Sequence, residues 1–230
     1  MRAEPGNSET AQRIAAAGWP YLQAPMLQIT PTGETLPALD RVRGLLFTSA
    51  NGVRAYSAAS DRRDLTAWCV GPATLAAAKL AGFTDLEHAD GNSEDLARLV
   101  IAKADVNAGA LLHVANRAAV GHLATKLRAA GFHVGFAPLY EAIAADTLPE
   151  EVVLALQAPQ PCVILIHSAK GAAAFARLAD TFDLSEHFAV CVSQAAAEPL
   201  LCLGFQKISW AVRPNEESVL ATVFSAYSTL

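Results

Sequence analysis

The sequence predicts an α/β fold of two similar parallel-sheet domains, one inserted into the other. Three observations support this prediction. Short β-rich runs alternate with longer Ala/Leu-rich runs of helical spacing, which is typical of βα units in a mostly parallel sheet. The two halves of the chain share motifs in the same order, and Pro- and Thr-rich breaks interrupt the chain at two separate places.

Five apolar runs are expected to be strands, each followed by a small polar or Gly-containing turn and then a helix. In chain order they are residues 45–48, 67–70, 110–114, 163–166 and 189–192. Two further helices are expected to begin at the sequences NSE (92–94) and NEE (215–217). In both, an Asn or Ser cap precedes acidic residues, which the helix dipole favours in the first turn.

Three pairs of segments reveal an internal duplication. LLFTSANGVRAYSA matches ILIHSAKGAAAFARL, and AWCVGPATLAAAKLAGF matches AVCVSQAAAEPLLCLGF. TAQRIAAAGWPYLQAPML matches ATKLRAAGFHVGFAPLYEA, and each of these two predicts a helix, a Gly stop, a strand and an exit through Pro. The copies lie 113 to 122 residues apart, about half the chain.

The breaks TPTGET and AADTLP have compositions that suit linkers. We therefore predict a discontinuous domain 1 from residues 1–30 and 147–230, with an inserted domain 2 from residues 36–140. Residues 31–35 and 141–146 would then be two linkers that run side by side and form a hinge.

Composition excludes several classes of protein. The formal net charge is −5 and no cluster of Lys and Arg occurs, which argues against nucleic acid and anionic membranes as partners. Neither a signal peptide nor a membrane-length apolar run is found. The four cysteines lack CxxC spacing and the six histidines lack metal-ligand spacing, so we expect reduced thiols, no metal and a cytoplasmic protein. Nothing indicates oligomerisation, and a monomer is expected.

Six motifs in order resemble the uroporphyrinogen-III synthase family over residues 2–223. They are TSANGV, CVGPATLAAAKLAGF, GNSEDLARL, APLYEA, HSAKG and RPNEESVLATV. The resemblance implies two flavodoxin/Rossmann-like domains, the second inserted into the first through a two-stranded linker. It also implies a cofactor-free lyase of heme and tetrapyrrole biosynthesis, which closes hydroxymethylbilane to uroporphyrinogen III with inversion of ring D and loss of water. A transient contact with hydroxymethylbilane synthase is a further implication.

The chain departs from the family pattern near its first residues. The family has an apolar strand before the residue matched by Arg2, and Ala3 stands where the family usually has Pro. Either that strand lies upstream or the first domain has one strand fewer. Asn51 stands where some relatives carry Arg, and Ala196 where many have Thr, so their shares in carboxylate binding are in doubt.

The substrate implied by the resemblance is rich in carboxylates and the chain is poor in clustered cations. Amides at helix N-termini bind carboxylates without formal charge, and in a parallel sheet these turns gather where ligands bind. We expect them on both walls of a cleft between the domains. The predicted binding residues are Arg2, Thr48, Ser49, Asn51, Gly71, Thr74, Asn92, Ser93, Ser168 and Ser193. For any one such turn alone, a plain N-cap worth about 1 kcal/mol is the better explanation.

Tyr140 matches the family Tyr that precedes the return linker. The resemblance implies that its phenol assists departure of the substrate hydroxyl, a general-acid contribution of roughly 10²-fold. The structural alternative is a hinge aromatic packed between domains. For His167, in the HSAKG turn, a structural role is the better explanation.

Two other function classes remain as alternatives. Duplicated α/β domains around a cleft also serve as non-catalytic small-molecule binding or sensor modules. A nucleotide-dependent Rossmann enzyme would require a glycine fingerprint that the chain lacks. No GxSxG nucleophile elbow supports a serine hydrolase.

Overall fold

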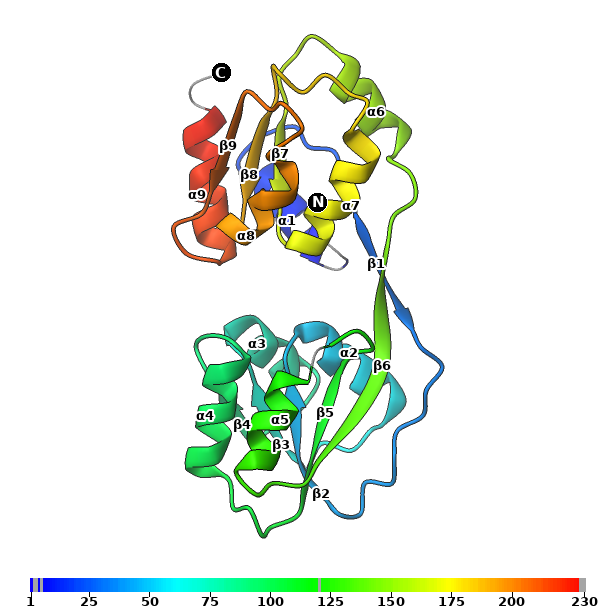
Figure 1. Cartoon of the computed structure of the whole chain (residues 1–230), viewed down its shortest axis with the longest axis vertical. Coiled ribbons are helices and arrows are strands. Elements are labelled where there is room, and N and C mark those ends of the chain that lie inside the picture. The colour runs from blue at the N-terminus through cyan, green and yellow to red at the C-terminus, as the bar shows by residue number, and fades with distance from the viewer. Residues whose placement is uncertain (2–3, 5, 120, 228–230) are drawn as a thin grey trace. The chain divides into compact units, whose positions relative to one another are not determined.

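The computed structural model describes the whole chain except residues 2–3, 5, 120 and 228–230. It divides into two compact units (Figure 1). Unit 1 contains Met1–Gln28 and Ile143–Leu230, and unit 2 is Ile29–Ala142. Unit 2 therefore interrupts the chain of unit 1. The chain passes from one unit to the other in β1 (Leu27–Pro31) and β6 (Val134–Ala144), which are neighbours in the sheet order.

Unit 2 alternates strands and helices around a parallel sheet. Its further strands are β2 (Val42–Phe47), β3 (Thr66–Cys69), β4 (Leu86–His88) and β5 (Ala110–Asn116). Its helices are α2 (Ala50–Ala59), α3 (Pro72–Leu80), α4 (Ser93–Lys103) and α5 (His122–Ala129). The strand order β6-β5-β2-β3-β4 has parallel pairs throughout. The chain thus winds outward from β2 in both directions, which makes the β2–β5 boundary the topological switch point where ligands of such folds bind.

Two apolar cores cover the two faces of this sheet. Leu45 and Phe47 of β2 lie in the core with Tyr56 of α2, whereas Leu46 lies in the core with Leu96 of α4 and Leu123 of α5. Successive side chains of a strand point to opposite faces, so an unbroken apolar run is what a sheet covered on both faces requires.

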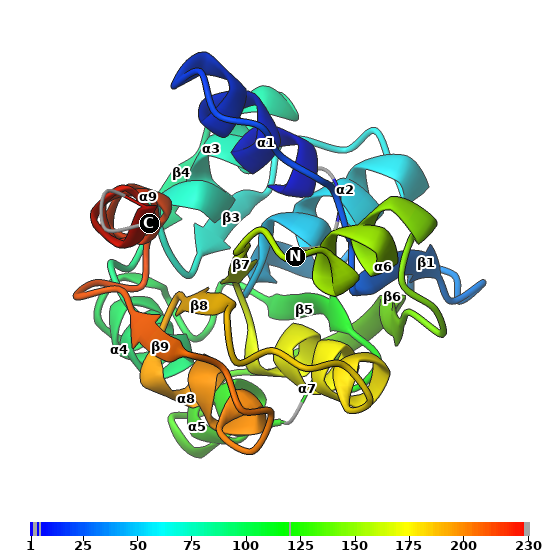
Figure 2. The same cartoon turned by 90° about the horizontal axis from the view of Figure 1, so that it is seen from above.

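Unit 1 holds a smaller parallel sheet of β7 (Val163–Ile166), β8 (Phe188–Cys191) and β9 (Lys207–Trp210), in that order. Helices α7 (Ala169–Ala179) and α8 (Gln194–Ala197) lie on one side of it and α9 (Glu216–Tyr227) lies on the other (Figure 2). The 3₁₀ turn Glu198–Leu200 follows α8. Two more helices, α1 (Gly6–Ala16) and α6 (Glu150–Gln157), complete the unit.

The predicted α/β fold class is confirmed, and each of the five predicted strands coincides with an observed strand to within a few residues. Three strands, β1, β4 and β9, were not predicted, because their sequences LQITP, LEH and KISW mix polar with apolar residues. The strand predicted between Gly18 and Pro25 is wrong, since residues 19–25 have no strand conformation. A strand needs a hydrogen-bonded neighbour, and none of the described residues pairs with this segment in a sheet.

Gly52 allows α2 to approach β5 at the switch point. A Cβ at Gly52 would lie 2.6 Å from the Val114 carbonyl oxygen, a backbone atom. Its counterpart in the duplication, Gly171, would place a Cβ 3.0 Å from Ser168 Oγ, the end of a side chain that can turn away. Only the first contact requires the backbone to move.

We therefore expect Gly52→Ala to lower the free energy of unfolding by about 2 kcal/mol, in the range of overpacked sites. Gly171→Ala is the matched control and is expected to change it by less than about 1 kcal/mol. Urea unfolding of both variants measures the difference. Equal losses in the two would show that α2 and β5 are not held at this distance.

Candidate functional site

Ser49 and Tyr140 meet at the switch point of unit 2. Ser49 directly follows β2 and is the N-cap of α2, where its Oγ accepts hydrogen bonds from the amides of Asn51 (3.2 Å) and Gly52 (3.4 Å). Tyr140 lies in β6 opposite Asn116 of β5. Its hydroxyl is 2.9 Å from Ser49 Oγ. The pair therefore spans β5, the strand that lies between β2 and β6.

The surroundings of Tyr140 keep its phenol protonated. The side chain is buried, and burial is the main cause that raises its pKa above the usual value. Hydrogen bonds from the Ser49 side chain and the Asn116 backbone act in the opposite direction. Ser49 Oγ already accepts two amide hydrogens, so its own proton is the one available to Tyr140. The phenol oxygen then accepts two hydrogen bonds, and its own proton is left for a ligand.

His113 of β5 contacts Thr48, the residue that precedes Ser49. Its Nε2 is 3.2 Å from Thr48 Oγ1, and its ring packs edge-on against Phe136 with centroids 5.7 Å apart. The side chain is only 3% exposed, and this burial lowers its pKa to about 4. His113 is therefore neutral at pH 7. It holds Thr48 in place and offers no charge to an anion.

Two exposed arginines, which were not predicted as binding residues from the sequence, lie at this edge. Arg54 Nη1 donates to Asn51 Oδ1 at 2.9 Å, so a guanidinium stands where the sequence indicates a lost charge. Arg117 follows β5; its amide donates to the Tyr140 carbonyl oxygen at 2.8 Å and its side chain lies 3.5 Å from Glu34 Oε1. Arg54 could have been predicted from the sequence, because it follows Asn51 by three residues and this spacing places both side chains on one helix face.

The other predicted residues of unit 2 do not join this pair through any hydrogen bond recorded for the described residues. Gly71 is the N-cap of α3 and makes no side-chain bond, and Thr74 lies inside α3 and is buried. Asn92 caps α4 in a reciprocal capping box with Asp95, and Ser93 is the first residue of that helix. The amide oxygen of Asn92 is therefore already engaged by its own helix.

Unit 1 carries the matching turns. Ser168 caps α7 by accepting from the Gly171 amide at 3.0 Å, and Ser193 caps α8, a helix of four residues. His167 Nε2 lies 3.1 Å from one carboxylate oxygen of Glu216, and Thr10 donates to the other at 2.6 Å. These contacts support the structural role expected for His167. The predicted binding residue Arg2 lies outside the described residues.

Within the part of the chain that the structure describes, no three His, Cys, Asp or Glu side chains gather in a way that could hold a metal ion. A search of the same residues finds no helix that is long and apolar enough to cross a membrane.

Known proteins resemble the chain in sequence pattern and in fold. A family model described as uroporphyrinogen-III synthase HemD matches residues 8–221. A crystal structure of uroporphyrinogen-III synthetase from Helicobacter pylori superposes with a TM-score of 0.67 at 18% identity, covering 90% of this chain and 93% of that one. A mutant uroporphyrinogen III synthase from Thermus thermophilus gives a TM-score of 0.53 at 15% identity, with both chains covered completely. A search of curated protein sequences gave no match.

Proposed function

From the family match over residues 8–221, the chain belongs to the uroporphyrinogen-III synthase family, and we propose that it closes hydroxymethylbilane at the Ser49–Tyr140 edge of unit 2. Members of this family are lyases of tetrapyrrole biosynthesis, so the non-catalytic sensor alternative is not favoured. The observation that carries the proposal is the buried phenol of Tyr140, 2.9 Å from Ser49 Oγ, because the bond that Ser49 donates leaves the phenol proton for a ligand.

In the proposed reaction, Tyr140 donates a hydrogen bond to the hydroxyl of the terminal hydroxymethyl group. The C–O bond breaks, the hydroxyl leaves with that proton as water, and a cation remains on the pyrrole methylene carbon. The substituted carbon of ring D attacks this carbon, and reclosure in the inverted orientation releases one ring proton, which restores the phenol. Burial raises the pKa of Tyr140, so the phenol keeps its proton at neutral pH. The bond that it donates strengthens as negative charge develops on the leaving oxygen.

The substrate carboxylates require a set of anion donors, and in unit 2 we propose the amides that follow Ser49 together with Arg54 and Arg117. The amides supply directed hydrogen bonds and the helix dipole. The guanidinium groups supply formal charge in a bidentate geometry that suits carboxylates. The main contribution of these groups is to position the substrate, because the uninverted closure occurs without an enzyme and must be excluded.

The test is direct. Purified protein is added to hydroxymethylbilane that a deaminase generates freshly, and the oxidised products are separated by chromatography. Predominantly type III uroporphyrin supports the proposal. Type I product alone, from protein shown to be folded by circular dichroism, would reject the activity for this chain.

We expect Arg54→Ala to raise KM for hydroxymethylbilane by about 5- to 10-fold while kcat stays within about twofold, because one charged contact contributes about 1 to 1.5 kcal/mol. Initial rates at several substrate concentrations measure both constants. Arg98→Ala is the matched control, since Arg98 is an exposed arginine of α4 that pairs with Asp95. A similar rise in KM for both variants would indicate a general charge effect instead of a site at Arg54.

We also propose that the two units are the two folding domains predicted from the duplication, and that the chain acts as a cytoplasmic monomer with hydroxymethylbilane as its substrate. All four cysteines are unpaired, and burial raises the pKa of the Cys69 and Cys191 thiols to about 12. Free thiols support a reducing compartment. A transient contact with hydroxymethylbilane synthase would shorten the path of an unstable substrate.

A further inference from the structure

The strand β6 contains one extra residue immediately before Tyr140. Val114 of β5 pairs with Ala137 of β6. The next pair joins Asn116 to Tyr140, so β5 has advanced by two residues and β6 by three. Residues 138–139 therefore stand opposite a single residue of β5, which is the arrangement of a β-bulge. Residue 138 is a proline, which has no amide hydrogen to donate and is accepted inside sheets mainly at bulges.

The bulge changes the side of the sheet to which Tyr140 points. Successive side chains of a regular strand point to opposite faces. Leu139 lies in the apolar core that contains Tyr56 of α2, so Tyr140 in a regular strand would point to the face away from α2. Instead, its hydroxyl lies 2.9 Å from Oγ of Ser49, the N-cap of α2. The bulge therefore brings the phenol to the candidate site.

Thr32, which follows β1, binds both carbonyl groups of the bulge. Its hydroxyl donates to the Pro138 carbonyl oxygen at 2.6 Å, and its amide donates to the Leu139 carbonyl oxygen at 3.1 Å. Carbonyl groups of successive residues point to opposite neighbours in a regular strand, so two such bonds to one residue belong to the bulged conformation. The amide of Glu34 donates to Thr32 Oγ1 at 3.3 Å, which leaves the hydroxyl proton directed at Pro138.

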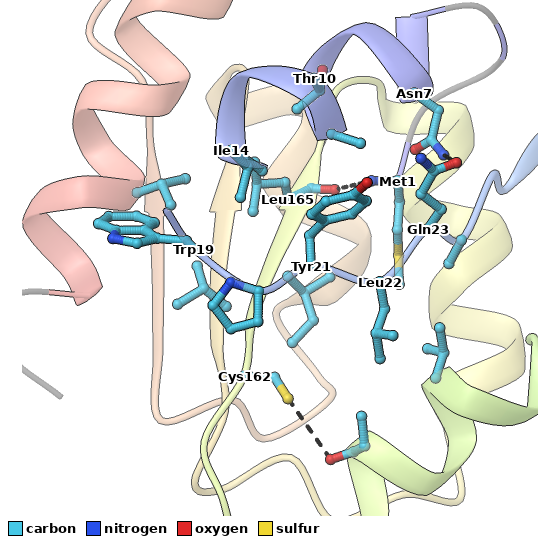
Figure 3. Close-up of a pocket in the computed structure, with 18 of the residues that line it drawn as sticks. Met1, Asn7, Thr10, Ile14, Trp19, Tyr21, Leu22, Gln23, Cys162 and Leu165 are labelled. Atoms are coloured by element: carbon cyan, nitrogen blue, oxygen red, sulfur yellow. Dashed lines mark hydrogen bonds between the residues drawn. The ribbon is translucent and has the colours of Figure 1, made fainter. Parts of the chain in front are cut away.

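The duplicated segment of unit 1 lacks this arrangement. Pro25 and Leu27 stand where unit 2 has Pro138 and Tyr140. Figure 3 shows the chain before Pro25, which includes Tyr21, along an apolar pocket of about 340 Å³. Within the described residues, this part of the chain pairs with no strand. The Ala-Pro sequence alone therefore does not produce the bulge, which depends on the neighbouring strands and contacts in unit 2.

We propose that Thr32 is a positioning residue for the synthase reaction, because it holds the bulge that places the phenol of Tyr140 beside Ser49. The inference rests on the proposed function, in which that phenol assists departure of the substrate hydroxyl. Loss of the Thr32 hydroxyl would remove the donor to the Pro138 carbonyl and allow the extra residue to shift along β6. A shift of one residue turns side chains to the opposite face, which would take Tyr140 away from Ser49.

The experiment removes a hydroxyl at two positions of the same segment. Thr32→Val keeps the branched shape and the amide, and it is expected to lower kcat about 10-fold with KM changed by less than about twofold. Thr32→Ser restores the hydroxyl and should keep kcat within about twofold of the unsubstituted protein. Thr30→Val is the matched control, because Thr30 Oγ1 in β1 is buried and has no hydrogen-bond partner among the described residues. Its kcat should also stay within about twofold.

A double-mutant cycle separates positioning from a general loss of structure. If Thr32 acts through the phenol, Thr32→Val should lower kcat by less than about twofold in a Tyr140→Phe background. The pKa of Tyr140, measured by NMR on ring-labelled tyrosine, gives a readout that needs no activity. The Ser49 hydrogen bond lowers this pKa, so Ser49→Ala is expected to raise it. In Thr32→Val the same substitution should move it less than about half as far.

Three results would overturn the inference. Thr32→Val could behave like Thr30→Val, in which case the hydroxyl that contacts Pro138 has no special role. A full loss of kcat that persists in the Tyr140→Phe background would show that Thr32 acts elsewhere. An undiminished effect of Ser49→Ala on the Tyr140 pKa in Thr32→Val would show that the bulge does not need this hydroxyl. If the unsubstituted protein gives only type I product, the proposed function fails, and the pKa comparison still decides whether Thr32 positions the phenol.

Discussion

Tyr140→Phe is expected to lower kcat for formation of uroporphyrinogen III about 100-fold, within the range that a single positioned proton donor contributes. The substitution removes the phenol that lies 2.9 Å from Ser49 Oγ and leaves the ring in its buried place. KM should change by less than about threefold, because the hydroxyl acts on a bond that breaks in the transition state. Product isomers and initial rates are measured in the same reactions.

The proton arrangement at this site can be tested apart from the rate. Ser49→Ala removes the donor to the phenol oxygen, so the pKa of Tyr140 should move further upward, since the Ser49 hydrogen bond opposes the effect of burial. Ser168→Ala is the matched control: it removes the equivalent cap of α7 without a tyrosine bonded to it. NMR titration of ring-labelled tyrosine, assigned with Tyr140→Phe, reports this pKa.

Two outcomes would contradict this role of Tyr140. Unchanged kcat in Tyr140→Phe would leave the residue as a packed aromatic, which is the structural alternative. An equal upward movement of the Tyr140 pKa in Ser49→Ala and Ser168→Ala would indicate that loss of a helix cap, and not loss of the hydrogen bond, perturbs the phenol.

The main strands could be predicted because their sequences are unbroken apolar runs. Residues 163–166 read VILI and form β7 with the predicted bounds, as expected where a parallel sheet is covered on both faces. β4 is an edge strand of three residues, LEH, without such an apolar run, so the pattern could not predict it. The strand prediction for residues 19–25 was wrong for a different reason. Their local sequence resembles that of β6, but strand formation depends on a neighbouring strand that local sequence does not reveal.

The candidate site was predictable as residue types and not as contacts. Ser49 and Tyr140 were both selected, yet their hydrogen bond joins residues 91 positions apart and depends on the order of β2, β5 and β6. Asn92 was selected for the same reason as Ser49, and its capping box gives it a local role. A strand-to-helix turn looks alike in the sequence whether its hydroxyl meets a second strand or only its own helix.

Acid should destabilise the protein through His113, the second large effect that we expect. Burial lowers the pKa of this imidazole from 6.5 to about 4. Between pH 6.5 and pH 4, the unfolded chain therefore binds a proton at His113 and the folded chain does not. Stability is therefore full above about pH 6.5 and falls as the pH decreases. Linkage gives a loss of roughly 2 kcal/mol by pH 5 and roughly 3 kcal/mol by pH 4.

Urea unfolding at a series of pH values tests this expectation. His113→Leu keeps an apolar side chain against Phe136 and gives up the contact with Thr48, so it lowers stability at pH 7 but should flatten the decline between pH 6.5 and 4. Carboxylates with lowered pKa values, Asp64 and Asp95 among them, add their losses at lower pH and do so in both proteins. The difference between the two curves therefore isolates His113. Parallel curves across this window would show that His113 can bind a proton in the folded state, and that the edge of β5 is open to water.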